Sequence, residues 1–389
     1  MTAFKKKKKN RSLFYRISAW LHLWLGIASG IVVVIVSVTG AILTFEEELR
    51  SLFQPYQHVQ SNGKQFLPPS VLADAVKKAY GIKGVSAVLY RGKDKSAVIP
   101  WYGDRKNYVV NYIDPYTAKP LYSQKLDDDF YRIMIIGHYQ LWLPRFIGKP
   151  LVAYSTLIFV ITLITGLVLW WPKKWTKSTR QQSFFIKTKA SLKRLNYDLH
   201  NVLGFYSLII AMVLGLTGMV YGMEWFSTAV YWTASGGEKF EYNKSLSDTT
   251  LLAKGTFPDE DLLFKRLQQT KVNLEHDIVT LGYPFGKAGV WNLAVNPRPG
   301  TRYLEKSDYF EQHSLKMLKA DPAFSDAHLG EQIRRLNYDL HVGSVGGLTT
   351  KIIAFLVCII SASLPITGFI VWLNKKKKKK PKLEMAVLQ

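Results

Sequence analysis

The chain is almost without cysteine, because Cys358 is the only one among 389 residues. A single thiol excludes an intramolecular disulfide, a cysteine zinc site and an iron–sulfur cluster, and C-x-x-C-H haem attachment is excluded with them. Any haem would therefore be bound without covalent attachment. The sequence also lacks a glycine-rich phosphate loop after a predicted strand, so nothing in it predicts a binding site for a nicotinamide or flavin cofactor.

Acidic residues are scarce as well. The chain has 28 Asp and Glu residues against 52 Lys and Arg residues, which gives a formal net charge of +24. A basic excess of this size is found in nucleic-acid-binding proteins. Here, however, the basic residues flank long apolar runs, so we attribute them to membrane topology and to attraction by anionic lipid.

Four apolar runs, at 20–45, 151–171, 202–223 and 348–373, are long enough to span a membrane. About 20 apolar residues are needed to cross a bilayer as a helix. No run contains Asp, Glu or Arg between its ends, and Lys351 lies in the first turn of the last run, where its stem can reach the surface. Four spans place both termini on the same side of the membrane.

The distribution of charge predicts which side that is. The two terminal segments and the short middle loop contain 22 basic and only two acidic residues. The long loops are nearly balanced, with 15 basic and 10 acidic residues in 46–150 and 14 and 16 in 224–347. The positive-inside rule makes the termini cytoplasmic and the long loops external. The first run is too long for a signal-peptide core and no cleavage pattern follows it, so we expect it to remain.

The two halves of the chain repeat a pattern of histidine, glycine and threonine. The first span has His22-x3-Gly26-x12-Thr39-Gly40, and the third has His200-x3-Gly204-x12-Thr217-Gly218. The second and fourth spans end in Thr165-Gly166-x3-Trp170 and Thr367-Gly368-x3-Trp372, with His138 and His341 27 and 26 residues before those threonines. The heptad RLNYDLH also occurs twice, at 194–200 and 335–341, but it joins positions that this repeat does not make equivalent.

The predicted fold class is a membrane α-helical protein: a four-helix transmembrane bundle from a duplicated span–domain–span unit, with two external α+β domains. In the first long loop we expect a helix at 69–80 and strands at 84–90, 96–101 and 108–113. In the second we expect a helix at 258–269 and strands at 277–283, 290–295 and 301–305. The predicted segments are a basic cytoplasmic N-terminus (1–19), a first span (20–45), an external domain (46–137), an interfacial segment with the second span (138–171), a basic cytoplasmic loop (172–199), a third span (200–223), a second external domain (224–335), an interfacial segment with the fourth span (336–373) and a basic cytoplasmic tail (374–389).

Four of the eight histidines lie at the edges of spans, two at each face of the membrane. We expect His22 to meet His200 at the cytoplasmic face, and His138 to meet His341 at the external face. Ionisable groups inside a bundle are costly enough to indicate function. A metal ion held by histidine alone, a proton relay and haem are all open, and bis-histidine haem fits a four-helix bundle best. The simpler interpretation is that such histidines sit among lipid headgroups.

Glycines on the faces that carry His22 and His200 support the haem interpretation. At 100° per residue, Gly26 lies about 40° from His22 and Gly40 returns to the same face, and Gly204 and Gly218 repeat this relation to His200. Small residues permit close helix packing, and beside a histidine they also leave room for a flat macrocycle. Asp198 and Asp339 are expected to cap helices. The remaining histidines, expected at solvated surface positions, are His58, His276, His313 and His328.

These stretches resemble the PepSY-associated transmembrane proteins, often called iron-regulated membrane proteins. The resemblance is carried by L-H-L-W-L-G at 21–26, by D-L-H-N-V-L-G at 198–204 and by the T-G-x-x-x-W span ends, and 109–116 is similar to the strand and turn that end a PepSY domain. The family implies four membrane helices, two PepSY domains and two non-covalent b-type haems. Carried onto this chain, the axial ligands of the haem irons are His22, His200, His138 and His341.

The resemblance also implies an activity. Members of the family include reductases that pass electrons to ferric siderophores outside the bacterial cytoplasmic (inner) membrane. The partners expected for this chain are the lipid bilayer, a ferric siderophore or other iron chelate, and a separate donor, either quinol or a cytoplasmic reductase. Two other functions stay open: a non-enzymatic accessory of iron or haem uptake, and a binding module that regulates an extracellular protease. No acid–base dyad or Ser–His–Asp arrangement stands out, so no catalytic residues are assigned.

Overall fold

The structure is a computed structural model that describes residues 11–61, 63–103, 108–242, 245–250 and 258–377. Most of the predicted basic N-terminus (1–19) and basic tail (374–389) lies outside these residues. The chain forms two compact units. The first comprises Met1–Thr44, Ile135–Met223 and Ile352–Gln389, and the second comprises Phe45–Met134 and Glu224–Lys351.

Four long apolar helices confirm the predicted spans. They are α1 (Leu13–Thr44), α5 (Arg145–Trp170), α8 (Gly204–Gly222) and α12 (Leu348–Lys377). The third span begins in α7 (Leu192–Asp198) and reaches α8 through a π-helical turn, Leu199–Leu203. Each span has 26 to 32 residues and a mean hydropathy of 2.1 to 2.4 in its most apolar window. The protein is therefore a multi-pass membrane protein.

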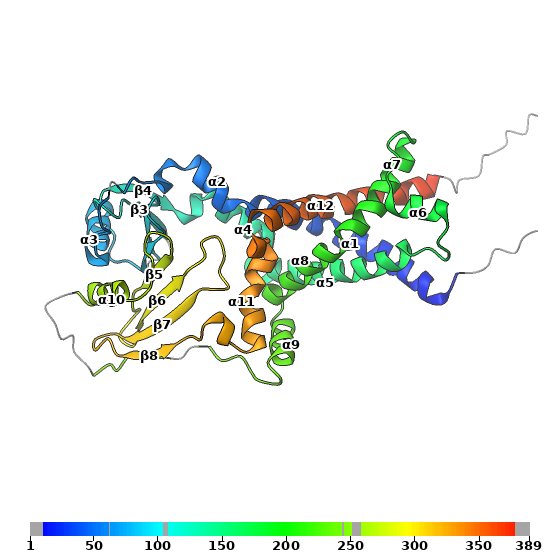
Figure 1. Cartoon of the computed structure of the whole chain (residues 1–389). Coiled ribbons are helices and arrows are strands. Elements are labelled where there is room, and N and C mark those ends of the chain that lie inside the picture. The colour runs from blue at the N-terminus through cyan, green and yellow to red at the C-terminus, as the bar shows by residue number, and fades with distance from the viewer. Residues whose placement is uncertain (1–10, 62, 104–107, 243–244, 251–257, 378–389) are drawn as a thin grey trace, which may run out of the picture. The chain divides into compact units, whose positions relative to one another are not determined.

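The spans pack around a ring in the order α1, α5, α8, α12, because α5 packs on α1 and α8 and α12 contacts both α1 and the start of α8. Figure 1 shows the four helices running alongside one another. Small residues lie where neighbouring helices cross. A Cβ atom at Gly215 of α8 would lie 2.8 Å from Val160 of α5, and one at Gly30 of α1 would lie 3.2 Å from Pro365 of α12. Helices without a hydrophobic force between them associate through such close contacts. This order places α1 and α8 diagonally opposite each other.

Aromatic side chains hold the middle loop against one end of the ring. Trp170, the last residue of α5, stacks on Phe205 of α8 with ring centroids 3.7 Å apart. Its indole Nε1–H donates to the carbonyl oxygen of Ser183, in the short helix α6 (Lys177–Phe184). The tryptophan of the repeated T-G-x-x-x-W pattern therefore joins two spans and anchors the loop between them.

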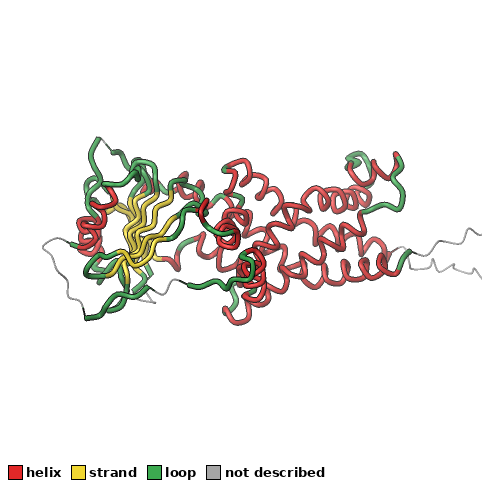
Figure 2. Tube along the Cα trace, turned by 60° about the horizontal axis from the view of Figure 1, so that its bottom comes forward, coloured by secondary structure: helices red, strands yellow, loops and turns green. Residues whose placement is uncertain are grey.

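The second unit contains one eight-stranded antiparallel sheet, in the order β4-β3-β2-β1-β5-β6-β7-β8 (Figure 2). Each half of the chain contributes a four-stranded meander, and the two meanders join where β1 pairs with β5. The sequence predicted one external α+β domain in each long loop, and in the structure the strands of both loops form one shared sheet. The strands are β1 (Ala87–Tyr90), β2 (Ala97–Trp101), β3 (Val109–Ile113), β4 (Pro120–Lys125), β5 (Ile278–Gly282), β6 (Val290–Asn296), β7 (Lys306–Glu311) and β8 (Met317–Ala320).

One helix from each half covers the same face of this sheet. Leu72 and Val76 of α3 (Pro69–Tyr80) and Leu263 of α10 (Asp259–Gln268) are fully buried with side chains of the central strands. Burial of each such side chain contributes about 1.5–3 kcal/mol. The two helices are tied together at Ser70, whose backbone N–H and hydroxyl both donate to Asp261. The two halves therefore share one hydrophobic core.

The predicted elements of this unit are largely confirmed, with one strand misplaced. The helix at 69–80 and the strands over the cores of 84–90, 96–101, 108–113, 277–283 and 290–295 are present, and the helix predicted at 258–269 is α10. The strand predicted at 301–305 is wrong, because the backbone N–H groups of Arg302 and Tyr303 donate to the carboxylate of Asp339 instead of to a ladder. The strand begins at Lys306, and β4 and β8 were not predicted.

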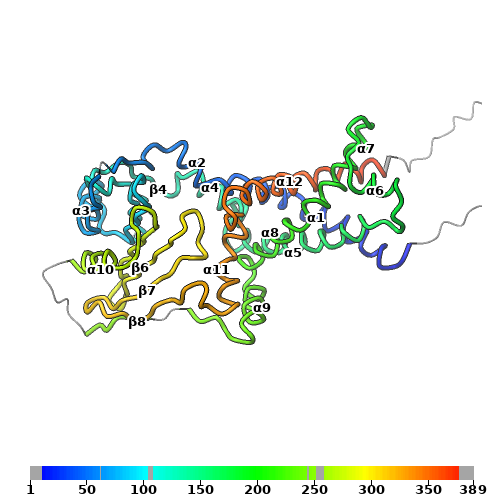
Figure 3. The backbone as a smooth tube through the Cα atoms, viewed as in Figure 1, coloured from blue at the N-terminus to red at the C-terminus, as the bar shows by residue number. Residues whose placement is uncertain are grey.

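The other helices of the chain are shorter and are traced in Figure 3. Helices α9 (Glu224–Ala234) and α11 (Leu329–Val342) pack against each other in the second unit. Short 3-10 turns lie at Pro55–Gln57, Leu126–Asp128, Phe324–Asp326 and Ser344–Gly346. The bounds of the helices are α2 (Glu46–Phe53), α4 (Phe130–Gln140), α9 (Glu224–Ala234) and α11 (Leu329–Val342).

Candidate functional site

Two histidines from opposite helices of the ring meet in its interior. His22 projects from α1 and His200 from the π turn before α8. Their ring centroids are 6.1 Å apart and their planes are inclined by 79°. Both rings are partly buried in the bundle. The structure thus brings together the pair that the sequence predicted for one face of the membrane.

Each of these imidazoles is oriented by the neighbouring helix. His22 Nδ1 lies 3.0 Å from the carbonyl oxygen of Thr162 and 3.3 Å from Thr165 Oγ1, both on α5. His200 Nδ1 lies 3.1 Å from the carbonyl oxygen of Leu364 and 3.0 Å from Thr367 Oγ1, both on α12. In both cases the carbonyl precedes the threonine by three residues, so the two halves of the bundle use the same device.

These contacts decide which ring nitrogen carries the hydrogen. A carbonyl oxygen can only accept, so Nδ1–H of each ring is the donor. The threonine hydroxyls give their own hydrogens to carbonyls one turn back, at 3.0 Å for Thr165 and 2.9 Å for Thr367, and so they accept from Nδ1 as well. A neutral imidazole with Nδ1–H keeps its lone pair on Nε2. Histidines that bind metals are commonly fixed in this way by a partner of the other nitrogen.

His138 of α4 makes the same pair of contacts with α1. Its Nδ1 lies 2.9 Å from the carbonyl oxygen of Val36 and 3.2 Å from Thr39 Oγ1. Val36 is fourteen residues beyond His22 on the same helix, a rise of about 21 Å. The first unit therefore orients imidazoles at two separated levels along α1.

A glycine after each of these threonines makes room for the ring. A Cβ at Gly166 would lie 3.1 Å from Cε1 of His22, one at Gly368 would lie 3.0 Å from Cε1 of His200, and one at Gly40 would lie 3.0 Å from Cε1 of His138. The sequence pattern contained this signal as one Thr-Gly pair in each span. Its use as a seat for a histidine of another helix was not predicted.

The structure gives the four predicted glycines different surroundings. Gly40 was expected to clear space for a macrocycle, but it lies against the imidazole of His138. Apart from its own stretch of α1, no described residue would lie within 4 Å of a Cβ at Gly26, which leaves open space one turn from His22. A Cβ at Gly204 would make an ordinary contact of 3.5 Å with Leu364. Gly218 follows Thr217 within α8.

The aspartate of the repeated heptad RLNYDLH has a similar use in both copies. Asp198 is completely buried, pairs with Arg194 at 2.8 Å and accepts from the backbone N–H of Lys187. Asp339 is equally buried and accepts the backbone N–H groups of Arg302 and Tyr303. In each copy a carboxylate two residues before a histidine therefore fixes a preceding loop. The expectation that these residues cap their own helices is wrong, because both lie inside or at the C-terminal end of a helix.

His200 is further constrained by backbone geometry. It lies in the π turn, a rare conformation that inserts one residue into a helix and is frequent at functional sites. Asn196, in the same heptad, donates its side-chain N–H to the carbonyl oxygen of Thr367 at 3.0 Å. The helix that presents His200 is thus fixed to the same turn of α12 that accepts from the imidazole.

His341 lies near the C-terminal end of α11, in the second unit, and is partly buried. Its pairing with His138 stays a prediction. The histidines expected at the surface are exposed except for His313, which is partly buried. His328 caps α11 by accepting the N–H of Glu331, and His58 lies 3.0 Å from the hydroxyl of Ser51.

The pair formed by His22 and His200 offers two nitrogen ligands and no more. Among the residues that the structure describes, no third His, Cys, Asp or Glu joins them to complete a metal-binding group. Structural zinc sites almost always use four protein ligands. The geometry therefore suits a metal ion that is already coordinated by a cofactor and takes only two further ligands from the protein.

Fold and site together define a multi-pass membrane protein with a histidine pair inside its helix bundle and a PepSY-like α+β part. The model of the PepSY-associated transmembrane region matches residues 19–375, nearly the whole chain, and the protein belongs to that family. No curated protein gives a significant match.

Proposed function

We propose that the protein is a transmembrane di-haem electron-transfer protein that reduces chelated ferric iron, such as a ferric siderophore, at the external face. His22 and His200 would hold one b-type haem from its two sides, and His138 and His341 would hold the second. Electrons would come from quinol or from a cytoplasmic reductase.

The distance between His22 and His200 is the observation that carries this proposal. A metal–nitrogen bond of about 2 Å on each side, and about 1.1 Å from each nitrogen to its ring centre, place two coaxial imidazole centroids roughly 6 Å apart. The separation of 6.1 Å agrees with that value. Porphyrin supplies the four equatorial nitrogens, so two protein ligands suffice. A Cβ at Gly26 would meet no described side chain of another helix, so the position one turn from His22 is free of protein that would obstruct a flat ring.

A haem bound in this way would cycle between the ferric and ferrous states and carry single electrons. The residues of the chain would set its behaviour through the acceptors of Nδ1–H. Each acceptor fixes the imidazole and increases its electron donation to iron, which stabilises the ferric state. His138 has acceptors of the same kind, a carbonyl oxygen and a threonine hydroxyl, about 21 Å along α1 from His22. This supports a second haem centre near the other end of the bundle.

The membrane topology is part of the proposal. The excess of basic residues in the termini and the middle loop supports a cytoplasmic location for these segments in the bacterial inner membrane, with the sheet outside. The symmetry of the sheet about the β1–β5 pair, together with the repeated His-Gly and Thr-Gly spacings, supports duplication of a span–domain–span unit.

An optical spectrum of the purified full-length protein tests the proposal. We expect low-spin haem at two per chain, reducible by a quinol analogue or dithionite and re-oxidised when a ferric chelate is added. His22→Ala should remove one haem and leave the other, and His276→Ala, at an exposed histidine of the second unit, should retain both. A colourless protein with no affinity for added haem would disprove it. Haem that is not re-oxidised by any ferric chelate would limit the function to electron transfer with another acceptor.

A further inference from the structure

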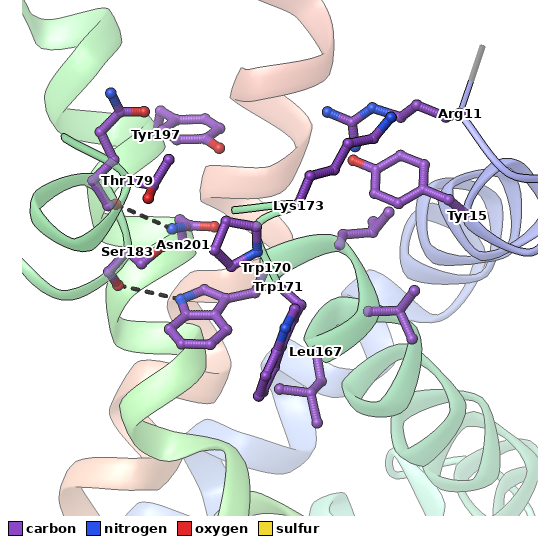
Figure 4. Close-up of a pocket in the computed structure, with 14 residues that line it drawn as sticks. Arg11, Tyr15, Leu167, Trp170, Trp171, Lys173, Thr179, Ser183, Tyr197 and Asn201 are labelled. Carbon is purple, nitrogen blue, oxygen red and sulfur yellow. Dashed lines mark hydrogen bonds between the residues drawn. The ribbon is translucent and has the colours of Figure 1, made fainter. Parts of the chain in front are cut away.

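A cavity of about 730 Å³ opens at the end of the bundle that contains His22 and His200 (Figure 4). Its wall comes from the start of α1, the end of α5 with the turn that follows, helix α6, and the residues around His200. All of these segments belong to the first unit. None of the contacts that orient the imidazoles uses the polar groups of this wall.

The cavity lies one to two helical turns beyond the imidazoles. Tyr15 precedes His22 by seven residues, which is about 10 Å along α1 and nearly the same helical face. Tyr197 precedes His200 by three residues, about 4.5 Å. Both phenols line the cavity. A haem carries its two propionate carboxylates roughly 8 Å from the iron by ordinary bond lengths, so they would reach this level.

The charges of the wall suit an anion. Among the described residues that line it, Arg11 and Lys173 are the only ionised side chains and none is a carboxylate. Within the described part of the chain neither forms an ion pair with Asp or Glu. Asp198, which belongs to this end of the bundle, is committed to Arg194 and Lys187. The guanidinium of Arg11 lies over the ring of Tyr15 at 3.8 Å, which positions it at the cavity.

The other polar groups of the wall can also donate to an anion. They are the hydroxyls of Tyr15, Tyr197 and Ser183 and the amides of Asn201 and Gln182. Figure 4 shows Arg11, Tyr15 and Lys173 on one side of the cavity and Tyr197, Thr179 and Asn201 on the other. The indoles of Trp170 and Trp171 form its apolar floor. Donors around an apolar floor suit the acidic edge of a flat aromatic ligand.

We infer that this cavity binds the propionate carboxylates of the haem held between His22 and His200, with Arg11 and Lys173 as their counter-ions. The inference rests on the proposed function and adds the orientation of that haem: its acidic edge faces the end of the bundle formed by α1, α5 and α6. Removal of either cation weakens binding of the carboxylates and leaves the axial ligands in place.

The test compares two porphyrins and four variants. Full-length protein produced without haem is titrated in detergent with iron protoporphyrin and with its dimethyl ester, which lacks the two negative charges, and the Soret band is followed. A His138→Ala background isolates the site at His22. Arg11→Gln and Lys173→Gln are compared with Arg16→Gln and Lys174→Gln, which are exposed cations in the same segments outside the cavity wall.

We expect each of the first two substitutions to weaken binding of the free acid about three- to tenfold and to leave binding of the ester unchanged. The control variants should behave as the wild type. Equal binding of both porphyrins by all variants would overturn the inference and leave the proposed haem site standing. Loss of a co-purifying anionic lipid from the Arg11 and Lys173 variants, with unchanged porphyrin binding, would assign the cavity to a lipid phosphate instead. Failure of the wild type to bind either porphyrin would overturn the proposed function together with the inference.

Discussion

Substitution of Gly368 by alanine tests whether the Thr-Gly turn seats His200. The added Cβ would lie 3.0 Å from Cε1 and 3.7 Å from Nε2 of the imidazole, where ordinary contacts begin at 3.4 Å. The ring must therefore move by roughly 0.5 Å, and the bond of 3.1 Å from Nδ1 to Leu364 lengthens toward its limit. Loss of that hydrogen bond costs about 1 kcal/mol, and overpacking of the site costs about 1–3 kcal/mol.

Both effects displace the imidazole of His200 from the position in which it and His22 would bind one haem iron. A total of about 2–4 kcal/mol corresponds to a haem affinity lowered roughly 30- to 1,000-fold. We expect Gly368→Ala to retain one haem per chain in place of two, measured as the pyridine haemochrome and by titration of the Soret band.

A matched variant separates this effect from general crowding. Alanine at Gly222 would be as crowded, with its Cβ 3.0 Å from Cβ of Ala153, but at a crossing of α5 and α8 that involves no imidazole. Gly222→Ala should lower the thermal stability and keep both haems. If Gly368→Ala retains two haems with an unchanged spectrum, the imidazole is not seated as the structure indicates and the reasoning is refuted.

Three further predictions follow from individual contacts. Thr165→Val or Thr367→Val removes an acceptor of Nδ1–H, so imidazole donates less to iron and the midpoint potential in a redox titration should rise by about 20–60 mV; an unchanged or lower potential would contradict this role. In Asp339→Asn an amide N–H faces backbone N–H groups that now donate to the carboxylate, so hydrogen bonds are lost. The free energy of unfolding of the second unit should fall by about 2–3 kcal/mol, measured by thermal denaturation. Asp326→Asn, at an exposed aspartate, should change it little. Burial alone would raise the pKa of Glu311, but hydrogen bonds from Ser314 and His313 outweigh it and lower that pKa. Because folding lowers this pKa from its ordinary value of 4.5, the stability that Glu311 contributes is present above pH 4.5 and is lost as the pH falls below that value. Glu311→Gln should therefore flatten the acidic part of a curve of unfolding free energy against pH. Parallel curves for the variant and the wild type would show that the carboxylate is not linked to folding.

The sequence by itself determined the features that depend on local composition and spacing. Apolar runs of sufficient length identified the four spans, since a bilayer imposes a minimum length on any helix that crosses it. Helical periodicity located α3 at 69–80, and β-branched and aromatic runs located most of the central strands. The repeated His-Gly and Thr-Gly spacings marked the turns that meet at the site. One strand was misplaced because a distant carboxylate, Asp339, captures the amides that the pattern assigned to a ladder.

Only the tertiary structure decided which of these features touch. The contact between His22 and His200 depends on the diagonal placement of α1 and α8. The partners of Nδ1 lie on other helices, α5 for His22 and α12 for His200, about 140 to 170 residues away in the chain. The pairing of β1 with β5, which joins the strands of the two halves into one sheet, likewise depends on which strand edges meet in the folded chain. Hydrogen bonds between helices and between strand edges are made by backbone groups that every residue carries, so the side-chain pattern along one segment does not specify which segment will be its partner.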